Sequence, residues 1–200
     1  MSVKVAIIYH SATGNLHHMA QRLEGTAKDA GAEVRRRQVT EIAPAQAIEG
    51  NPAWKAHVEA TKDEPRATPD DMDWADVVLL GSPTRYGNVS SQFQQFIDTL
   101  GPLWAQGGLA DKVYSTFTST QTAHGGQETT LHTLHHMAAH FGGIIVPPGY
   151  TDPLKFADGN PYGSSHVSGA TGDAPLADAL LAALDHQVRR VLHVAERLTR

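Results

Sequence analysis

Apolar residues recur along the chain in two patterns, short continuous runs and helical spacings, and the two patterns alternate. The runs at residues 3–9 and 76–81 are almost wholly apolar, which is typical of strands buried on both faces of a parallel sheet. Shorter runs at 112–117 and 144–146 predict two more strands. A more polar run at 33–39 predicts a strand near a sheet edge.

Helical spacing fills the intervals between these runs. It covers residues 16–27 and 93–100, and a histidine-rich segment at 128–140. The last helix is expected to begin at Asp173, a good N-cap, with Pro175 in its first turn. The alternation predicts an α/β fold with a five-stranded parallel sheet and helices on both faces. A chain of 200 residues suits one domain, 1–200.

Two stretches interrupt this alternation. Residues 41–73 contain four prolines and no sustained period, and residues 149–172 are rich in Gly, Pro and Ser. Long irregular segments inside a compact domain are usually functional or serve assembly. We therefore predict irregular insertions at about 41–73 and 149–172.

The loops after the first, third and fourth strands are the expected ligand site, because parallel sheets bind ligands outside the carboxyl ends of their strands. The first loop, residues 11–15, offers two hydroxyls, a glycine and the backbone N–H groups of a helix start, which favour an anion. It has no Lys or Arg, and it matches neither the Walker A nor the G-x-G-x-x-G pattern. The loop predicts a phosphate bound by neutral donors, with a plain helix N-cap as the alternative.

The other two loops suit the planar part of a ligand. In residues 82–88, Pro83 stiffens the strand exit, Tyr86 offers a flat face and Gly87 lets a ligand approach the backbone. Residues 119–126 are small and polar, so they could hydrogen-bond a ring edge rich in N and O atoms. An ordinary βα turn and a flexible surface loop are the alternatives. The common position of the three loops predicts a phosphorylated planar cofactor.

Composition and charge narrow the class of protein. The formal net charge is -5, with 16 Lys+Arg against 21 Asp+Glu, which argues against direct nucleic acid binding. The sequence has no cysteine, so disulfides and Cys-ligated metals are excluded and redox chemistry would need a bound cofactor. We find no signal-peptide pattern and no apolar run of membrane length, and we expect a cytoplasmic protein without membrane contact.

Three histidines of the 128–140 segment share one helix face. His132, His136 and His140 stand at i, i+4 and i+8, a spacing that could bind zinc or nickel. No complementary carboxylate cluster is visible, and a partly exposed helix face lining a site is the alternative. No metal site is therefore predicted.

Several motifs resemble one family. Residues 81–88, Gly-Ser-Pro-Thr-Arg-Tyr-Gly-Asn, resemble the (G)TPTRFGN signature of the WrbA family of NAD(P)H:quinone oxidoreductases. Further matches follow in order along the chain, with GGQE at 125–128, VPPGY at 146–150 and NPYG at 160–163. Residues 9–15 fit the family's phosphate loop, and the resemblance runs from about residue 3 to the end.

The resemblance implies a flavodoxin-like fold with strand order 2-1-3-4-5, an FMN cofactor and a homotetramer. The third loop departs from the family's S-T-G-T-G-G-G form by one added residue, and Phe141 stands where the family often has a second histidine. The residues that the resemblance places at FMN are Ser11, Ala12, Thr13, Gly14, Asn15, Leu16, Pro83, Thr84, Arg85, Tyr86, Gly87, Asn88, Ser119, Thr120, Gln121, Thr122, His124, Gly125 and His140.

The reaction implied by the resemblance is two-electron reduction of a quinone to a hydroquinone by NAD(P)H, with ping-pong kinetics and the flavin as hydride carrier. Thr13 and Trp104 would contact the substrate. His140 would be the catalytic hydrogen-bond partner of the quinone, and Arg85 would stabilise negative charge on the reduced cofactor. The alternatives are a one-electron flavodoxin-type carrier, a Trp-repressor-binding accessory protein and a metal-dependent hydrolase.

Overall fold

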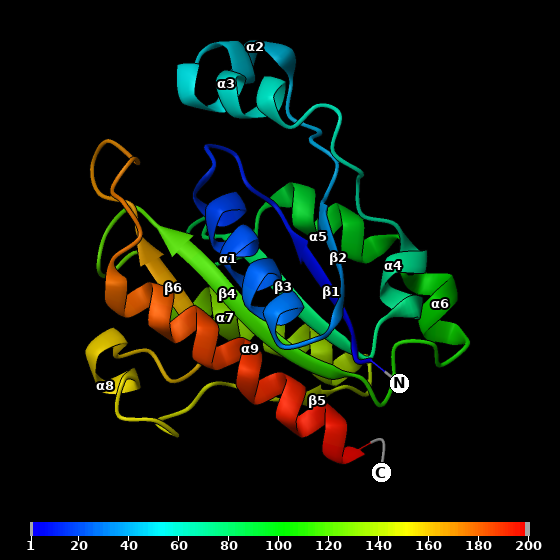
Figure 1. Ribbon diagram of the computed structural model, residues 1–200. Helices are drawn as coiled ribbons and strands as arrows, with labels where there is room; N and C mark the ends of the chain where they lie inside the picture. Colours follow the sequence, from blue (N-terminus) through cyan, green and yellow to red (C-terminus); the bar gives the residue numbers. More distant parts are fainter. Residues whose placement is uncertain (1, 199–200) are drawn as a thin grey trace.

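A twisted parallel sheet runs through the middle of the molecule in the computed structural model, which describes residues 2–198 (Figure 1). The strands are β1 (Lys4–Tyr9), β2 (Glu33–Gln38), β3 (Val77–Pro83), β4 (Val113–Thr120) and β5 (Ile144–Ile145). They lie in the order β2-β1-β3-β4-β5 and all pair in parallel. The predicted order is confirmed, and the polar β2 forms an edge, as its composition predicts.

A sixth strand departs from the prediction. β6 (Ser164–Val167) pairs in parallel with the second half of β4, while β5 pairs only with its first residues, Val113 and Tyr114. The chain leaves the sheet after Val146 because Pro147 and Pro148 have no N–H to continue the ladder. The prediction that residues 149–172 are an irregular insertion misses two elements, since β6 and the short helix α8 (Lys155–Asp158) lie within them, while the rest of the stretch has no helix or strand.

Helices cover both faces of the sheet, as predicted. One face carries α1 (Asn15–Asp29) and α9 (Asp178–Leu198), and the other carries α4 (Pro69–Trp74), α5 (Ser91–Asp98) and α7 (Gln127–His140), with α6 (Gly101–Ala105) following α5 (Figure 1). No helix among the described residues is long and apolar enough to cross a membrane.

The start of the last helix is a correction. α9 begins at Asp178 and not at Asp173. The Ala174 N–H donates to Ser168 O at 3.0 Å, and His166 Nε2 donates to Ala174 O at 3.0 Å. These bonds hold residues 173–177 against the end of β6 in a non-helical conformation. Asp173 is therefore not the N-cap residue of α9.

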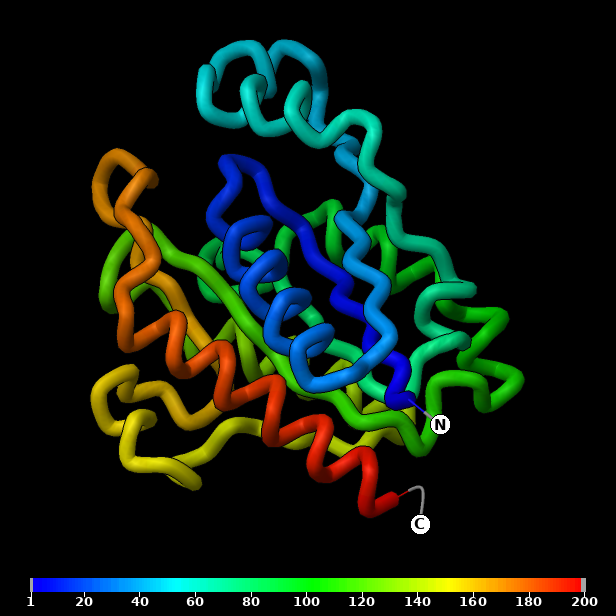
Figure 2. Tube along the Cα trace, in the orientation of Figure 1, coloured from blue at the N-terminus to red at the C-terminus, as the bar shows by residue number. Residues whose placement is uncertain are grey.

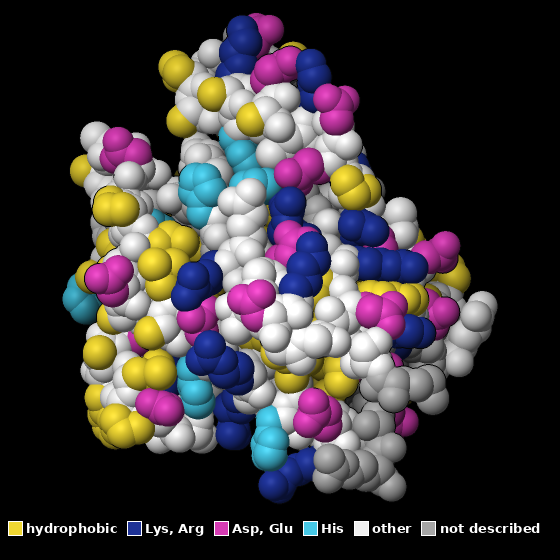
Figure 3. Space-filling view, viewed as in Figure 1, with side chains coloured by type: hydrophobic (Ala, Val, Ile, Leu, Met, Phe, Trp, Pro, Cys, Tyr) yellow, Lys and Arg dark blue, Asp and Glu magenta, His cyan; other side chains and the backbone are white. Residues whose placement is uncertain are grey.

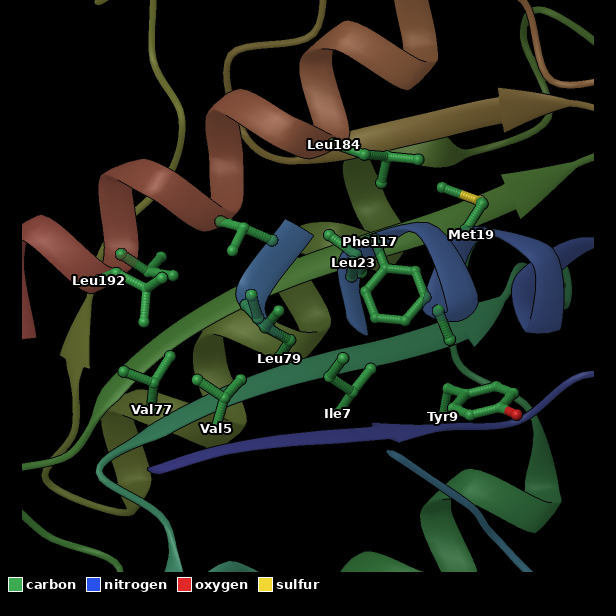
Figure 4. Close-up of a cluster of buried hydrophobic side chains, with 14 of the residues drawn as sticks. Val5, Ile7, Tyr9, Met19, Leu23, Val77, Leu79, Phe117, Leu184 and Leu192 are labelled. Carbon is green, nitrogen blue, oxygen red and sulfur yellow. The ribbon is translucent and has the colours of Figure 1, made fainter. Parts of the chain in front are cut away.

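The apolar core forms two layers, one on each face of the sheet. Figure 4 shows the layer in which Ile7, Leu79 and Phe117 of the strands meet helix side chains such as Leu23 and Leu184. The next residues along the strands point to the opposite layer, so β1, β3 and β4 are buried on both faces, as the continuous apolar runs predict. A Cβ at Gly81 would lie 2.2 Å from Phe117 Cζ, which explains the glycine inside β3.

The prediction of an irregular insertion at 41–73 is also wrong. The stretch holds α2 (Ala45–Glu49), α3 (Pro52–Ala60) and α4. Its prolines begin helices: Pro52 and Pro69 stand in the first turns of α3 and α4, where a missing N–H costs no helical hydrogen bond. We call α2 and α3, residues 45–60, the cap, because they stand over the loop between β1 and α1 (Figure 2).

Candidate cofactor site

The carboxyl ends of β1, β3 and β4 open into a cavity of about 630 Å³. The three loops predicted to hold one ligand meet at its wall, which confirms their common position. The predicted cofactor residues found in this wall are Ser11, Ala12, Thr13, Asn15, Leu16, Pro83, Thr84, Arg85, Tyr86, Ser119, Thr120, Gln121, Thr122 and Gly125.

Four predicted residues support the loops from outside the wall. The Gly14 N–H donates to Ser11 Oγ at 3.1 Å and so shapes the first loop. Gly87 and Asn88 belong to the turn after β3, whereas His124 is exposed in the loop after β4.

Trp104 and His140 lie away from the cavity. α7 begins at Gln127 beside the cavity and ends at His140, and its 14 residues span roughly 20 Å at 1.5 Å per residue. Trp104 Nε1 donates to the backbone oxygen of His140 at 2.9 Å, and Trp104 is 56% exposed. The structure therefore joins these two residues to each other, and within one chain it does not bring either of them to the cavity.

The end of the cavity predicted to hold a phosphate, called the phosphate end below, is built from neutral donors. The first backbone N–H groups of α1 have no partner within the helix and carry the positive end of its dipole. Gln38 Nε2 donates to Ser11 O at 3.2 Å, which ties the loop to the end of β2. Among the described residues of the cavity wall, Arg85 is the one with a charged side chain, and it lies on the loop after β3.

The end of the cavity predicted to hold the planar ring, called the ring end below, is shaped by a tight turn. Arg85 and Asn88 exchange two backbone hydrogen bonds of 2.7 and 3.0 Å, and Tyr86 and Gly87 between them have φ of 52° and 81°. A left-handed tyrosine costs about 1–2 kcal/mol, and the turn leaves its ring fully exposed. The side chain is thus presented as a free flat surface at the mouth of the cavity.

The loops after β3 and β4 are fastened to each other. Thr84 Oγ1 donates to Gly125 O at 3.2 Å and accepts from Thr130 Oγ1 at 2.9 Å. A Cβ at Gly126 would lie 2.7 Å from Gly87 Cα, so only glycine permits this approach of the two loops. The ring end is therefore formed by one connected unit.

Two parts of the wall are not marked by any pattern in the sequence. Residues 168–172 close one side, where Gln121 Nε2 donates to Ala170 O at 2.8 Å and Asn15 Nδ2 donates to Gly172 O at 2.9 Å. Asn51, at the start of α3, closes another. No apolar period marks either part, because both are placed by polar contacts to loops distant in the sequence.

Glu41 connects the cap to the frame of the site. Its carboxylate accepts from His10 Nε2 at 3.3 Å, Trp54 Nε1 at 2.9 Å and Gln92 Nε2 at 2.6 Å. Burial alone would raise the pKa of Glu41, but the hydrogen bonds from His10, Gln92 and the Ala43 N–H outweigh it and bring the pKa to about 2. Burial also lowers the pKa values of His10 and Arg85.

The histidines of α7 have structural neighbours. His132 packs on Tyr162 with ring centroids 4.5 Å apart, and the buried His135 hydrogen-bonds Thr116 Oγ1 at 3.0 Å. Within residues 2–198, no group of three or more His, Asp or Glu side chains is placed to hold a metal ion.

A parallel sheet of this order, with one cavity at its carboxyl ends where the start of α1 meets the loops after β3 and β4, defines a flavodoxin-like mononucleotide-binding protein. The comparisons with known proteins agree. Residues 3–152 match the family model described as NADPH-dependent FMN reductase, and the chain belongs to that family. FMN is the cofactor, and the three loops fit its phosphate and its ring.

The chain is similar to known proteins along almost its whole length. A Deinococcus radiodurans protein named NAD(P)H dehydrogenase (quinone) is 49% identical over 98% of this chain and 97% of its own. A Geotalea uraniireducens protein of the same name is 37% identical over 99% and 100% of the two chains. A WrbA-like protein from Agrobacterium tumefaciens shares the fold, with a TM-score of 0.66, 22% identity and 98% and 99% coverage. The predicted family resemblance is confirmed.

Proposed function

We propose that this protein is an FMN-dependent NAD(P)H:quinone oxidoreductase that reduces quinones by two electrons. The observation that carries the proposal is the cavity itself, which joins a phosphate seat to an exposed tyrosine face where flat molecules can stack. The names of the relatives, which are NAD(P)H dehydrogenases acting on quinones, support the same chemistry.

When bound by the three loops, FMN would supply the redox chemistry, the transfer of a hydride from NAD(P)H to a quinone, which with one proton becomes a hydroquinone as NAD(P)⁺ is formed. The side chains of this protein position the partners. Tyr86 forms a wall for the stacked ring, Thr13 contacts the substrate at the phosphate end, and Arg85 stabilises negative charge at the ring end. Since both substrates need the same face, they bind in turn, which gives ping-pong kinetics.

Trp104 and His140 complete the site of another subunit in a homotetramer. Their mutual hydrogen bond, the exposure of Trp104 and their distance from the cavity of their own chain support this arrangement. His140 would then hold a quinone oxygen and supply its proton, with Trp104 as the opposite wall. Sedimentation should show tetramers that carry the activity, and fully active monomers would contradict shared sites.

Anaerobic mixing tests the reaction. FMN-loaded protein mixed with NADH should lose its flavin absorbance, and benzoquinone added next should restore it without a persistent radical signal. Failure of NADH to bleach the flavin would exclude the oxidoreductase. A persistent radical would instead favour a one-electron carrier. We place the reaction in the cytoplasm, where NAD(P)H is generated.

A further inference from the structure

The loop of residues 11–16 lines one side of the phosphate end of the cavity, and other residues line the opposite side. An FMN phosphate carries up to two negative charges and three acceptor oxygens at neutral pH. The loop approaches it with α1 N–H groups and hydroxyls, and no charged side chain stands in the described wall at this end. The opposite side of the phosphate loop is occupied by the cap.

α3 presents its N-terminus to this end of the cavity. Asn51, its N-cap residue, lines the cofactor cavity together with Thr13 and Asn15. Asn51 and Ala53 also line an adjoining cavity of about 320 Å³ that has the same two loop residues in its wall. Asn51 Oδ1 accepts from the Trp54 N–H at 3.1 Å, so the cap interaction uses the oxygen and leaves the amide N–H₂ as a donor.

α3 also lies beside the phosphate loop. A Cβ at Gly14 would lie 3.7 Å from His57 Nδ1 of α3 and 3.7 Å from His18 Cε1 of α1. His57 is buried, and its Nε2 pairs with Gln38 Oε1 at 3.2 Å, while Gln38 Nε2 donates to Ser11 O. Figure 3 shows histidine side chains gathered where the cap meets the body of the molecule.

Polar contacts fix the cap in this place. Glu41 accepts from Trp54 in α3, His10 at the end of β1 and Gln92 in α5. Of the residues in α2 and α3, all of which the structure describes, His57 is the one that is buried. The position of α3 over the phosphate loop therefore depends on Glu41 and on the His57–Gln38 contact more than on apolar packing.

We propose that α3 is the second half of the phosphate seat: the Asn51 side-chain amide and the Ala53 N–H bind the FMN phosphate from the side opposite residues 11–16. Pro52 has no N–H, and the Trp54 and Lys55 N–H groups already donate to Asn51. Glu41 is the positioning residue that holds α3 there. The inference rests on FMN as the cofactor and on the cap contacts, and it does not depend on which substrate reduces the flavin.

The substitution Asn51→Asp tests the proposed contact between the Asn51 amide and the FMN phosphate. Asp is as good an N-cap as Asn, so α3 should stay intact, but N51D removes the amide donor and puts a negative charge beside the phosphate. Dissociation constants for FMN and for riboflavin, which lacks the phosphate, are measured by quenching of flavin fluorescence. Gln46→Glu adds the same charge to the exposed face of α2, outside both cavities, and serves as the matched control.

N51D should raise the FMN dissociation constant at least tenfold and change the riboflavin constant less than twofold. Q46E should change neither constant more than twofold. If N51D binds FMN like the wild type, α3 does not contact the phosphate. If N51D weakens FMN and riboflavin equally, the substitution acts on the shape of the cavity and the proposal fails.

Glu41→Gln tests the positioning role. E41Q should lower the preference for FMN over riboflavin several-fold, because α3 is released from the phosphate. The loss of the Glu41 charge near Arg85 at the ring end acts on both flavins alike and leaves their ratio unchanged. Amide exchange should rise in α3 and stay unchanged in β3. An equal loss of affinity for both flavins, or an unchanged ratio, would overturn the role of Glu41. These binding measurements need neither NADH nor a quinone, so they are independent of the proposed reaction.

Discussion

Two regions of the molecule meet at the same phosphate loop, and they are stabilised in different ways. On one side, β1 and its neighbours are buried on both faces between two apolar layers. On the other, the cap is attached through Glu41 and the His57–Gln38 contact. Apolar burial fixes the frame of the site, whereas a few polar groups fix the element that closes it.

The difference implies two levels of stability. Segments with few buried apolar contacts open locally at much lower free energy than the core. The cap should therefore open and close while the sheet stays folded. Mutations in the sheet should change global unfolding, and mutations in the cap contacts should change local opening and cofactor affinity.

The largest expected effect comes from the sheet. Phe117→Ala empties a fully buried position between β4 and the helices and should reduce the free energy of unfolding by about 3–5 kcal/mol. Urea unfolding measures it. Phe156→Ala, at a position 72% exposed in α8, should cost under about 1 kcal/mol. Equal losses for the two variants would contradict the difference in burial.

A fall in pH should destabilise the cap and the sheet in distinguishable ways, and this is the second largest expected effect. Burial lowers the pKa of His57 in the cap and of His135, which packs from α7 against the sheet, to about 4, with neighbouring histidines adding to the shift. The unfolded chain takes up these protons near pH 6.5 and the native protein does not. The stabilisation is therefore complete above pH 6.5 and is lost as pH falls toward 4, roughly 2 kcal/mol per histidine at pH 5.

Substitution of His135 should affect global unfolding, and substitution of His57 should affect local opening of the cap. His135→Gln should flatten the pH dependence of global unfolding between pH 6.5 and 4. His57→Gln should mainly flatten the pH dependence of amide exchange in α3. If H57Q changed global unfolding as much as H135Q does, the cap and the sheet would form one cooperative unit.

The smallest effect should come from a single hydrogen bond of the cap. Trp54→Phe keeps an aromatic ring in α3 and removes the N–H that donates to Glu41. The loss of about 1 kcal/mol should speed amide exchange in α3 about fivefold and leave the urea midpoint unchanged. A shifted midpoint would show that this bond also holds the sheet.

The difference between apolar burial in the sheet and polar contacts in the cap also explains which parts of the fold could be predicted from the sequence. The apolar runs of β1 and β3 and the spacing of Leu16 and Leu23 report burial directly, so the sheet, its helices and its edge were predictable. β6, at residues 164–167, has no such run, because it is placed by pairing with β4. Pro52 and Pro69 looked like breaks in the sequence but stand at the starts of α3 and α4.

The residues of the site also fall into two groups, those that the sequence predicts and those that it does not. The loops 11–16, 83–88 and 119–125 follow strands, and topology alone brings them together. Asn51 and residues 168–172 reach the cavity through contacts such as Glu41–Trp54 and Gln121–Ala170, which no local pattern encodes. Trp104 and His140 were predicted at the flavin by resemblance, and their distance from the cavity could not be known before the path of α7 was seen.

The central claim is that one cavity serves NAD(P)H and the quinone in turn. Initial rates measured with NADH varied at several fixed concentrations of benzoquinone test it most directly. Parallel lines are expected in double-reciprocal plots, because the first product leaves before the second substrate binds. Lines that intersect would show that both substrates are bound together, and would contradict the claim.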